Sequence, residues 1–264
     1  MRLSFAFKIM DSSKELIKAT NLLLETASLL MVSGANTIRV NLTINRFASV
    51  LNFKTSCFIS HKSIIMTLYE EDTTRTCTRV KNIPPHAINF SIISAISKIS
   101  WDAVTEDWTL EHIEKELEAI KNQKRYSKIT VLIAVSLAGA GFCNIFKGDY
   151  INMLVAFIST FIGLLIFQLT HKEKFNVYMR IVLGSFIASL IAGFGVLFQI
   201  GSHPQSALAT SILYLVPGVA LINSFTDLLD NNIINGMVRF TTGLMTVLAI
   251  ALGLFVTMLI FKLN

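Results

Sequence analysis

The sequence predicts an α-helical integral membrane protein in which five transmembrane helices follow a cytoplasmic α+β domain with a small antiparallel sheet. Hydrophobic residues make up 53% of the 264 residues, and the mean hydropathy of +0.60 lies above the usual range of soluble proteins. Charge is unevenly distributed, because residues 1–128 contain 17 of the 23 Lys and Arg and 13 of the 17 Asp and Glu. We therefore expect a soluble domain at residues 1–125 and a membrane domain at residues 126–264.

The N-terminal domain is expected to combine helices with a sheet. Asp11–Ser13 supply N-cap residues for an apolar helical pattern that ends at Gly34. β-Branched, alternating segments separated by His61-Lys62 and Glu71–Thr73 predict three antiparallel strands, and Pro84-Pro85 ends the sheet. The remaining predicted elements are a helix at about 37–51, strands at 54–60, 63–70 and 74–80, and helices at about His86–Ser100 and Leu110–Gln123, the last capped by Thr109.

The first residues do not form a signal-peptide pattern. MRLSFAFKIM has a positive start, but its apolar stretch is too short for a signal-peptide core and Lys8 interrupts it. We therefore expect the N-terminal domain to stay in the cytoplasm.

Charge and cysteine patterns argue against several functional classes. The net charge of +6 does not indicate nucleic-acid binding, because acidic residues are interleaved with the basic ones. Cys57, Cys77 and Cys143 lack disulfide or zinc-site spacing, and no glycine-rich phosphate loop is present, so we expect neither metal nor cofactor. Cys57 and His61 are the best nucleophile–base pair, but no third orienting group accompanies them, so we expect no catalytic residues and no enzyme activity.

Five apolar segments in the second half approach or exceed the ~20 residues needed to cross a bilayer core. They lie at about 129–146, 151–169, 177–198, 207–225 and 237–261. With the N-terminus inside, eight Lys or Arg flank the inner ends of these spans, whereas Lys147 and Lys262 flank the outer ends. Because cytoplasmic flanks carry the excess of positive charge, we expect a multi-pass protein of the bacterial inner membrane with its C-terminus outside.

The odd number of spans suggests a missing half. Transporters are often assembled from two halves of inverted topology, with the substrate site between them. This chain has no convincing internal repeat. We therefore expect either a second, smaller membrane subunit of opposite topology or a homo-oligomer.

The fourth span contains the main candidate site. Pro217 and Gly218 predict a break near its middle, which would leave free carbonyls and a half-helix N-terminus for an anionic substrate. Asn223 and Asp227 lie toward its inner end, and Arg239 begins the next span. Asp227 and Arg239 could pair with each other, bind a carboxylate or carry a proton. Alternatively, Asp227 caps a short helix and Arg239 only follows the charge rule.

Two motifs resemble those of the threonine/serine exporter family. The stretch VPGVALINSFTDLLDNNIINGMVR is similar to a family signature of Pro-Gly, Asn, Asp, Gly and Arg, and LLMVSGANTIRV is similar to a small-Gly-Ala turn followed by Thr and Arg. The matching residues are Pro217, Gly218, Asn223, Asp227, Gly236 and Arg239 in the first motif and Ser33, Gly34, Ala35, Thr37 and Arg39 in the second. TRVKNIP and GAGFCNIFKGD, which contains Asn144, also resemble family stretches. The resemblance runs from about residue 15 to the C-terminus.

The resemblance implies a fold, a partner and a cargo. The chain is similar to the larger subunit of the split members, which include two-component succinate exporters with a smaller membrane subunit. The implied activity is gradient-driven export of threonine and serine, or of succinate, across the inner membrane. Arg239 and the broken-helix terminus suit either cargo, because a zwitterion and a dianion share a carboxylate.

Other interpretations stay open. Asn144 is a secondary pathway candidate, as are Gly34, Thr37 and Arg39, whose turn has backbone and basic groups suited to anions. A plain helix connection explains the same turn. The chain as a whole could instead be a membrane-anchored enzyme or sensor with its active site in the N-terminal domain, near Cys57, His61 or Arg39, or a channel-like or scaffolding subunit.

Overall fold

A computed structural model describes residues 2–70, 75–85, 87–124, 126–171 and 175–262, with the side chains of the first helix from residue 14 onward. The chain forms two compact units. The first contains the residues up to Lys124 together with Val219–Phe240, and the second contains Arg125–Gly218 and the residues from Thr241 onward. Residues 219–240 therefore pack with the N-terminal part of the chain.

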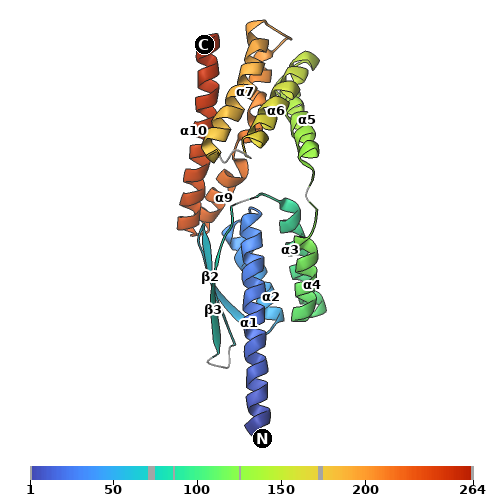
Figure 1. The fold of residues 1–264 in the computed structure, drawn as a ribbon, viewed down its shortest axis with the longest axis vertical. Coiled ribbons are helices and arrows are strands. Elements are labelled where there is room, and N and C mark those ends of the chain that lie inside the picture. Colours follow the sequence, from blue (N-terminus) through green and yellow to red (C-terminus); the bar gives the residue numbers. More distant parts are fainter. Residues whose placement is uncertain (1, 71–74, 86, 125, 172–174, 263–264) are drawn as a thin grey trace. The chain divides into compact units, whose positions relative to one another are not determined.

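The first unit is built from helices and one sheet (Figure 1). In chain order its elements are α1 (Arg2–Val32), α2 (Thr37–Val50), β1 (Lys54–Ile59), β2 (Ser63–Tyr69), β3 (Thr76–Asn82), α3 (Phe90–Glu106), α4 (Leu110–Lys121), α9 (Gly218–Leu229) and the first turns of α10 (Ile233–Phe261). The strands form an antiparallel sheet in the order β1-β2-β3, which confirms the predicted three-stranded sheet. The predicted turn at Glu71–Thr73 lies outside the described residues.

Two predicted helix boundaries differ from the structure. The first helix begins at Arg2, so the start predicted at Asp11–Ser13 is wrong. Residues 2–10 contain neither Gly nor Pro, and several of them are good helix formers, so nothing in the sequence interrupts the helix there. The second difference concerns the helix that follows the sheet, whose predicted start at His86 lies outside the described residues. Helix α3 begins after Asn89, whose side chain accepts the N–H groups of Ser91 and Ile92, and it continues past the predicted end at Ser100 to Glu106.

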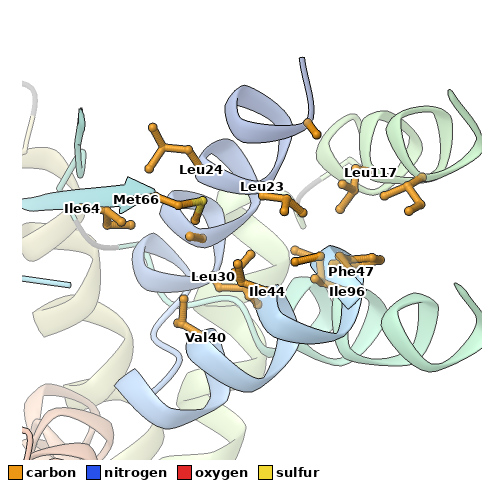
Figure 2. Close-up of a cluster of buried hydrophobic side chains, with 14 of the residues drawn as sticks. Leu23, Leu24, Leu30, Val40, Ile44, Phe47, Ile64, Met66, Ile96 and Leu117 are labelled. Carbon is orange, nitrogen blue, oxygen red and sulfur yellow. The ribbon is translucent and has the colours of Figure 1, made fainter. Parts of the chain in front are cut away.

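The hydrophobic core of the first unit lies between one face of the sheet and helices α1–α4. Ile64, Met66 and Leu68 alternate along β2 and are fully buried on this face, as the period of two in a half-buried strand requires. Side chains from four helices pack in the same cluster (Figure 2), including Leu23 and Leu30 of α1, Phe47 of α2, Ile96 of α3 and Leu117 of α4. This core holds the connection between α1 and α2 in place.

The second unit contains α5 (Lys128–Ile145), α6 (Tyr150–Leu169), α7 (Val177–Leu197), α8 (Pro204–Ser211), the short 3₁₀ helix η1 (Leu213–Leu215) and the rest of α10. A hydrogen bond of 2.6 Å joins Ser189 of α7 to Thr257 of α10. At one end of α6, Asp149 caps the helix and also accepts hydrogen bonds from the backbone and hydroxyl of Ser202, which fastens two loops together.

Four helices, α5, α6, α7 and α10, are long and apolar enough to cross a membrane. The predicted fourth span corresponds to a broken pair, in which α8 with η1 and then α9 are bent by 60°. The break falls at Val216 and Pro217, and α9 begins at Gly218. The structure therefore has four candidate spans among its described residues, or five if the bent pair counts as one, and the break predicted at Pro217 and Gly218 is present.

Candidate functional site: a buried polar cluster in the first unit

The α1–α2 connection forms one side of a polar cluster. Gly34 has a φ of +94°, a conformation that a residue without a side chain adopts at little cost. The N–H of Gly34 bonds to the carbonyl of Met31 and that of Ala35 to the carbonyl of Leu30, which is the Schellman pattern of a helix C-terminus. Asn36 then caps α2 by accepting the N–H of Arg39 at 2.9 Å. This tight turn leaves the carbonyls of Gly34 and Ala35 free to accept other donors.

The helical hairpin of α9 and α10 forms the other side of the polar cluster. Asn231 has a φ of +60°, and the N–H of Asn232 reaches back to the carbonyl of Asp227 at 2.8 Å, so α9 also ends in a Schellman motif. Gly236 allows the two helices to approach closely, because a Cβ at this position would lie 2.6 Å from Cγ of Leu228. The close approach brings Arg239 of α10 beside Asp227 of α9.

Asp227 and Arg239 form a buried ion pair. The Arg239 Nη1 atom lies 3.4 Å from the Asp227 Oδ2 atom, and the exposed fractions of the two side chains are 7% and 0%. The other carboxylate oxygen accepts the backbone N–H of Thr37, the first residue of α2, at 2.9 Å. Asp227 thus places its negative charge at the N-terminus of α2, where free N–H groups and the helix dipole favour an anion.

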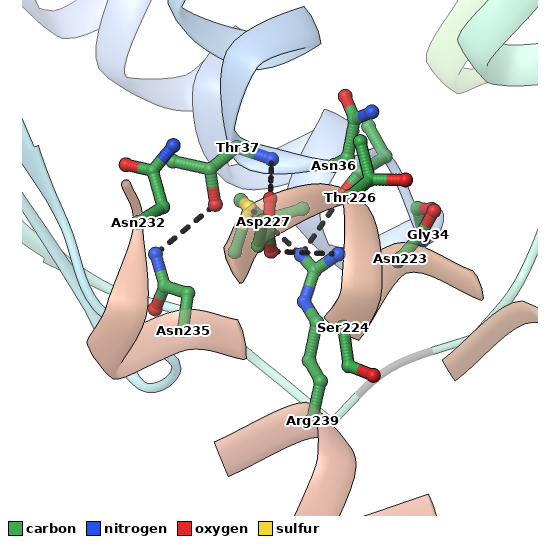
Figure 3. Close-up of polar contacts among 12 residues, drawn as sticks. Gly34, Asn36, Thr37, Asn223, Ser224, Thr226, Asp227, Asn232, Asn235 and Arg239 are labelled. Carbon is green, nitrogen blue, oxygen red and sulfur yellow. Dashed lines mark hydrogen bonds and ion pairs between the residues drawn. The ribbon is translucent and has the colours of Figure 1, made fainter. Parts of the chain in front are cut away.

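Further hydrogen bonds join the α9–α10 hairpin to the α1–α2 turn (Figure 3). Arg239 donates to the carbonyl of Ala35 at 2.8 Å and contacts the sulfur of Met31 at 3.6 Å. Asn223 donates to the carbonyl of Gly34 at 2.8 Å. The two carbonyls that the turn leaves free therefore both accept donors from α9 and α10.

Asn235 extends the cluster to the sheet. Its amide nitrogen donates to the Thr37 hydroxyl at 3.1 Å and to the carbonyl of Ile59, at the end of β1, at 2.8 Å. Sequence reasoning missed this residue, although one signal was available: Asn235 lies four residues before Arg239, so a helix places both on one face. Its carbonyl oxygen is buried and has no hydrogen-bond partner within the part of the chain that the structure describes.

The structure brings together five of the residues singled out in the sequence: Gly34, Thr37, Asn223, Asp227 and Arg239. Arg39 does not join them, because its side chain is exposed on α2. Pro217 and Gly218 form the break before α9, and Asn144 is an exposed residue of α5 in the second unit.

The Cys57 thiol is a poor candidate for a nucleophile. Burial raises its pKa to about 11, so that little of the reactive thiolate is present near neutral pH. Cys57 stands on β1 opposite Met66 of β2, against the core of the first unit. These surroundings are those of a partly buried structural cysteine.

The polar cluster depends on both charges of its buried ion pair. Removing one member of a buried ion pair leaves the other charge without compensation, at a cost of roughly 3–5 kcal/mol. A proton on Asp227, or a competing carboxylate at Arg239, would therefore weaken the bonds that hold the α1–α2 turn to α9 and α10.

Comparisons with known proteins agree with these motifs. The model of a family described as "Putative threonine/serine exporter" matches residues 21–261. Two relatives are named "Probable succinate transporter subunit YjjP". The one from Klebsiella aerogenes is 26% identical over 241 residues, which cover 90% of this chain and 92% of the relative. The one from Escherichia coli K12 is 25% identical over 249 residues, which cover 93% and 95%. No solved structure matches.

Proposed function

Because the chain belongs to the threonine/serine exporter family, we propose that it is one subunit of a secondary exporter of small carboxylates, either threonine and serine or a dicarboxylate such as succinate. The four long apolar helices and the bent pair support a multi-pass membrane protein. The names of the two relatives favour succinate as a cargo and a second membrane subunit as a partner.

The proposed exporter lies in the bacterial inner membrane. Residues 1–125 form its cytoplasmic domain, residues 126–264 form its membrane domain, and the C-terminus is outside. This orientation follows from the excess of Lys and Arg beside the inner ends of the spans. The partner, a smaller subunit of opposite topology, supplies the spans that complete an inverted pair.

The buried pair of Asp227 and Arg239 carries the site assignment. In the proposed cycle a proton neutralises Asp227, the ion pair separates, and the Arg239 guanidinium becomes available to the carboxylate of the cargo. The same event releases the N–H of Thr37 from Asp227. Coupling of cargo to a proton gradient therefore needs no residue beyond those already in contact.

The break at Pro217 and Gly218 has a distinct role in this proposal. Pro217 has no N–H to donate, and the chain at the break leaves regular helical bonding. A discontinuous span offers backbone groups to a substrate. We assign Pro217 and Gly218 to the shaping of the pathway and Asn223 to polar contact with the cargo or with the α1–α2 turn.

The test is an export assay in cells that contain the chain together with the proposed smaller membrane subunit. We expect Asp227→Asn and Arg239→Ala to lose export of succinate or threonine while the protein still inserts into the membrane. Asp230→Asn is the matched control, because Asp230 lies three residues from Asp227 and forms no ion pair among the described residues. Normal export by both Asp227→Asn and Arg239→Ala would exclude the site assignment.

Gradient dependence separates a secondary exporter from a channel. Because the proton on Asp227 and the cargo are bound together in this cycle, we expect export from loaded proteoliposomes to be fastest with an acidic interior and to slow when a protonophore collapses that proton gradient. Flux that depends on the cargo gradient alone would favour a channel-like subunit instead.

A further inference from the structure

The first unit contains a groove outside the polar cluster, between α2 and α3. Its volume is about 320 Å³, within the range of small-molecule sites. Its walls combine polar and charged side chains with two apolar ones, and the lining residues are Asn36, Ile38, Arg39, Leu42, Thr43, Arg46 and Ser97. Of these side chains the polar cluster uses only that of Asn36, which caps α2.

Two arginines dominate the charge of this groove. Arg39 and Arg46 are seven residues apart on α2, so both face the same side of the helix, about 10 Å apart along its axis. Helix α2 contains no acidic residue. Within the part of the chain that the structure describes, neither guanidinium forms an ion pair with a carboxylate. The groove thus holds two positive charges that no described acidic side chain balances.

Arg46 is held in position rather than free in solvent. Its guanidinium carbon lies 3.9 Å from the centre of the Trp101 ring, a cation–π contact. It also donates to the Ser100 hydroxyl at 3.2 Å, and that hydroxyl donates to the carbonyl of Ser97 at 2.7 Å. An arginine fixed in this way loses less conformational entropy on binding an anion.

The apolar part of the groove restricts the class of ligand. Leu42 lies between the two arginines and is 51% exposed, beside Ile38. A molecule with a short hydrocarbon segment and a carboxylate can cover Leu42 while its oxygens meet a guanidinium fork. We propose that this groove binds a small carboxylate of one or two acid groups.

The groove connects to the polar cluster through a short stretch of backbone. Asn36 lines the groove and accepts the N–H of Arg39, and the next residue, Thr37, donates its N–H to Asp227. A ligand that alters Arg39 or Asn36 therefore acts on the same turn that Asp227 and Arg239 hold. This regulatory consequence rests on the proposed exporter function, whereas the binding itself does not.

The experiment measures binding of succinate to the purified full-length chain in detergent by isothermal titration calorimetry. We expect saturable binding that weakens at least tenfold in the double variant Arg39→Gln/Arg46→Gln. Leu42→Asp retains both arginines and places a carboxylate between them, so it should block the same binding. The matched control is Arg79→Gln, which removes an exposed arginine of β3 that lies outside the groove.

The outcomes separate this proposal from the proposed function. Groove-dependent binding in Asp227→Asn, which is expected to lose export, supports the groove independently of transport. The proposal is overturned if the wild type shows no saturable binding, or if binding is unchanged in Leu42→Asp and in the double arginine variant. Equal competition by inorganic phosphate would overturn the assignment to carboxylates.

Discussion

At the scale of residues, Asp227 and Arg239 have a structural task as well as the proposed transport task. Both charges are buried, and each also bonds to the α1–α2 connection, through the N–H of Thr37 and the carbonyl of Ala35. A variant of either residue therefore changes the stability of the first unit as well as any transport step. Loss of export in a single variant needs a stability measurement beside it.

A double-mutant cycle separates the effect of these variants on stability from their effect on transport. We expect Asp227→Asn to destabilise the protein by roughly 3–5 kcal/mol, because it leaves the Arg239 guanidinium buried without a counter-charge. Adding Arg239→Met should recover much of that loss, because a buried pair can often be replaced by apolar side chains at little cost. Unfolding in detergent measures both effects. If the two single effects simply add, the pair does not interact, whereas a double variant that regains stability without export isolates the transport role.

The Cys57 thiol provides a pH test of the enzyme alternative. Its pKa is raised to about 11 by burial, and alkylation requires the thiolate, so its reaction rate should continue to rise up to about pH 11. At pH 7 we expect alkylation in the Cys77→Ser/Cys143→Ser background to be roughly a hundredfold slower than for a free thiol of ordinary pKa. Iodoacetamide labelling followed by mass spectrometry checks this. Rapid labelling near neutral pH would indicate an activated cysteine and revive the enzyme hypothesis.

Sequence reasoning identified most of the polar cluster but not its geometry. Asn223, Asp227 and Arg239 attract attention because polar residues in apolar spans are costly. Their partners could not be deduced, because Thr37 and Asp227 are 190 residues apart and no local spacing joins them. Asn235 was missed because an amide in an apolar helix is equally well explained by contacts between membrane helices.

At the scale of elements, two helix ends of the same type border the cluster. Gly34 ends α1 and Asn231 ends α9, each in a left-handed conformation. The sequence predicted the first of these ends from Gly34, and it predicted the break before α9 from Pro217 and Gly218. It missed the start of α1, because capping residues at Asp11–Ser13 also fit inside a helix whose preceding residues favour helix formation.

The packing of α9 against α10 can be tested at Gly236. A Cβ there would lie 2.6 Å from Cγ of Leu228 and 3.0 Å from its backbone nitrogen, so Gly236→Ala must push the helices apart. We expect a loss of about 1–3 kcal/mol, typical of overpacking, and a weaker Asp227–Arg239 contact with reduced export.

Gly141→Ala in α5 is the control for this variant. A Cβ at Gly141 meets no atom within 4 Å, and replacing a helical glycine by alanine should add up to about 1 kcal/mol of helix stability. Thermal unfolding and export assays on both variants test whether stability and export depend on the close approach at Gly236. Equal behaviour of Gly236→Ala and Gly141→Ala would show that the close approach at Gly236 does not matter.

At the scale of the whole molecule, hydropathy and packing describe different divisions of the chain. Hydropathy separates residues by the solvent that they prefer, and it identified the four long apolar helices and the bent pair. Contacts group Val219–Phe240 with the N-terminal residues, although this stretch is largely apolar. Hydropathy could not anticipate that grouping, because it depends on specific partners such as Asn235 with Ile59 and Asp227 with Thr37.

The orientation of the whole chain is testable by cysteine labelling. In a background with Cys57, Cys77 and Cys143 replaced by Ser, single cysteines are introduced as Ser91→Cys, an exposed position in α3, and Lys262→Cys, just after α10. Because the inner flanks carry the excess of Lys and Arg, we expect a membrane-impermeant maleimide to label Lys262→Cys in intact spheroplasts. Ser91→Cys should react only after the membrane is permeabilised. Labelling of Ser91→Cys from outside would reverse the proposed topology, and labelling of both positions from the same side would require an even number of spans between them.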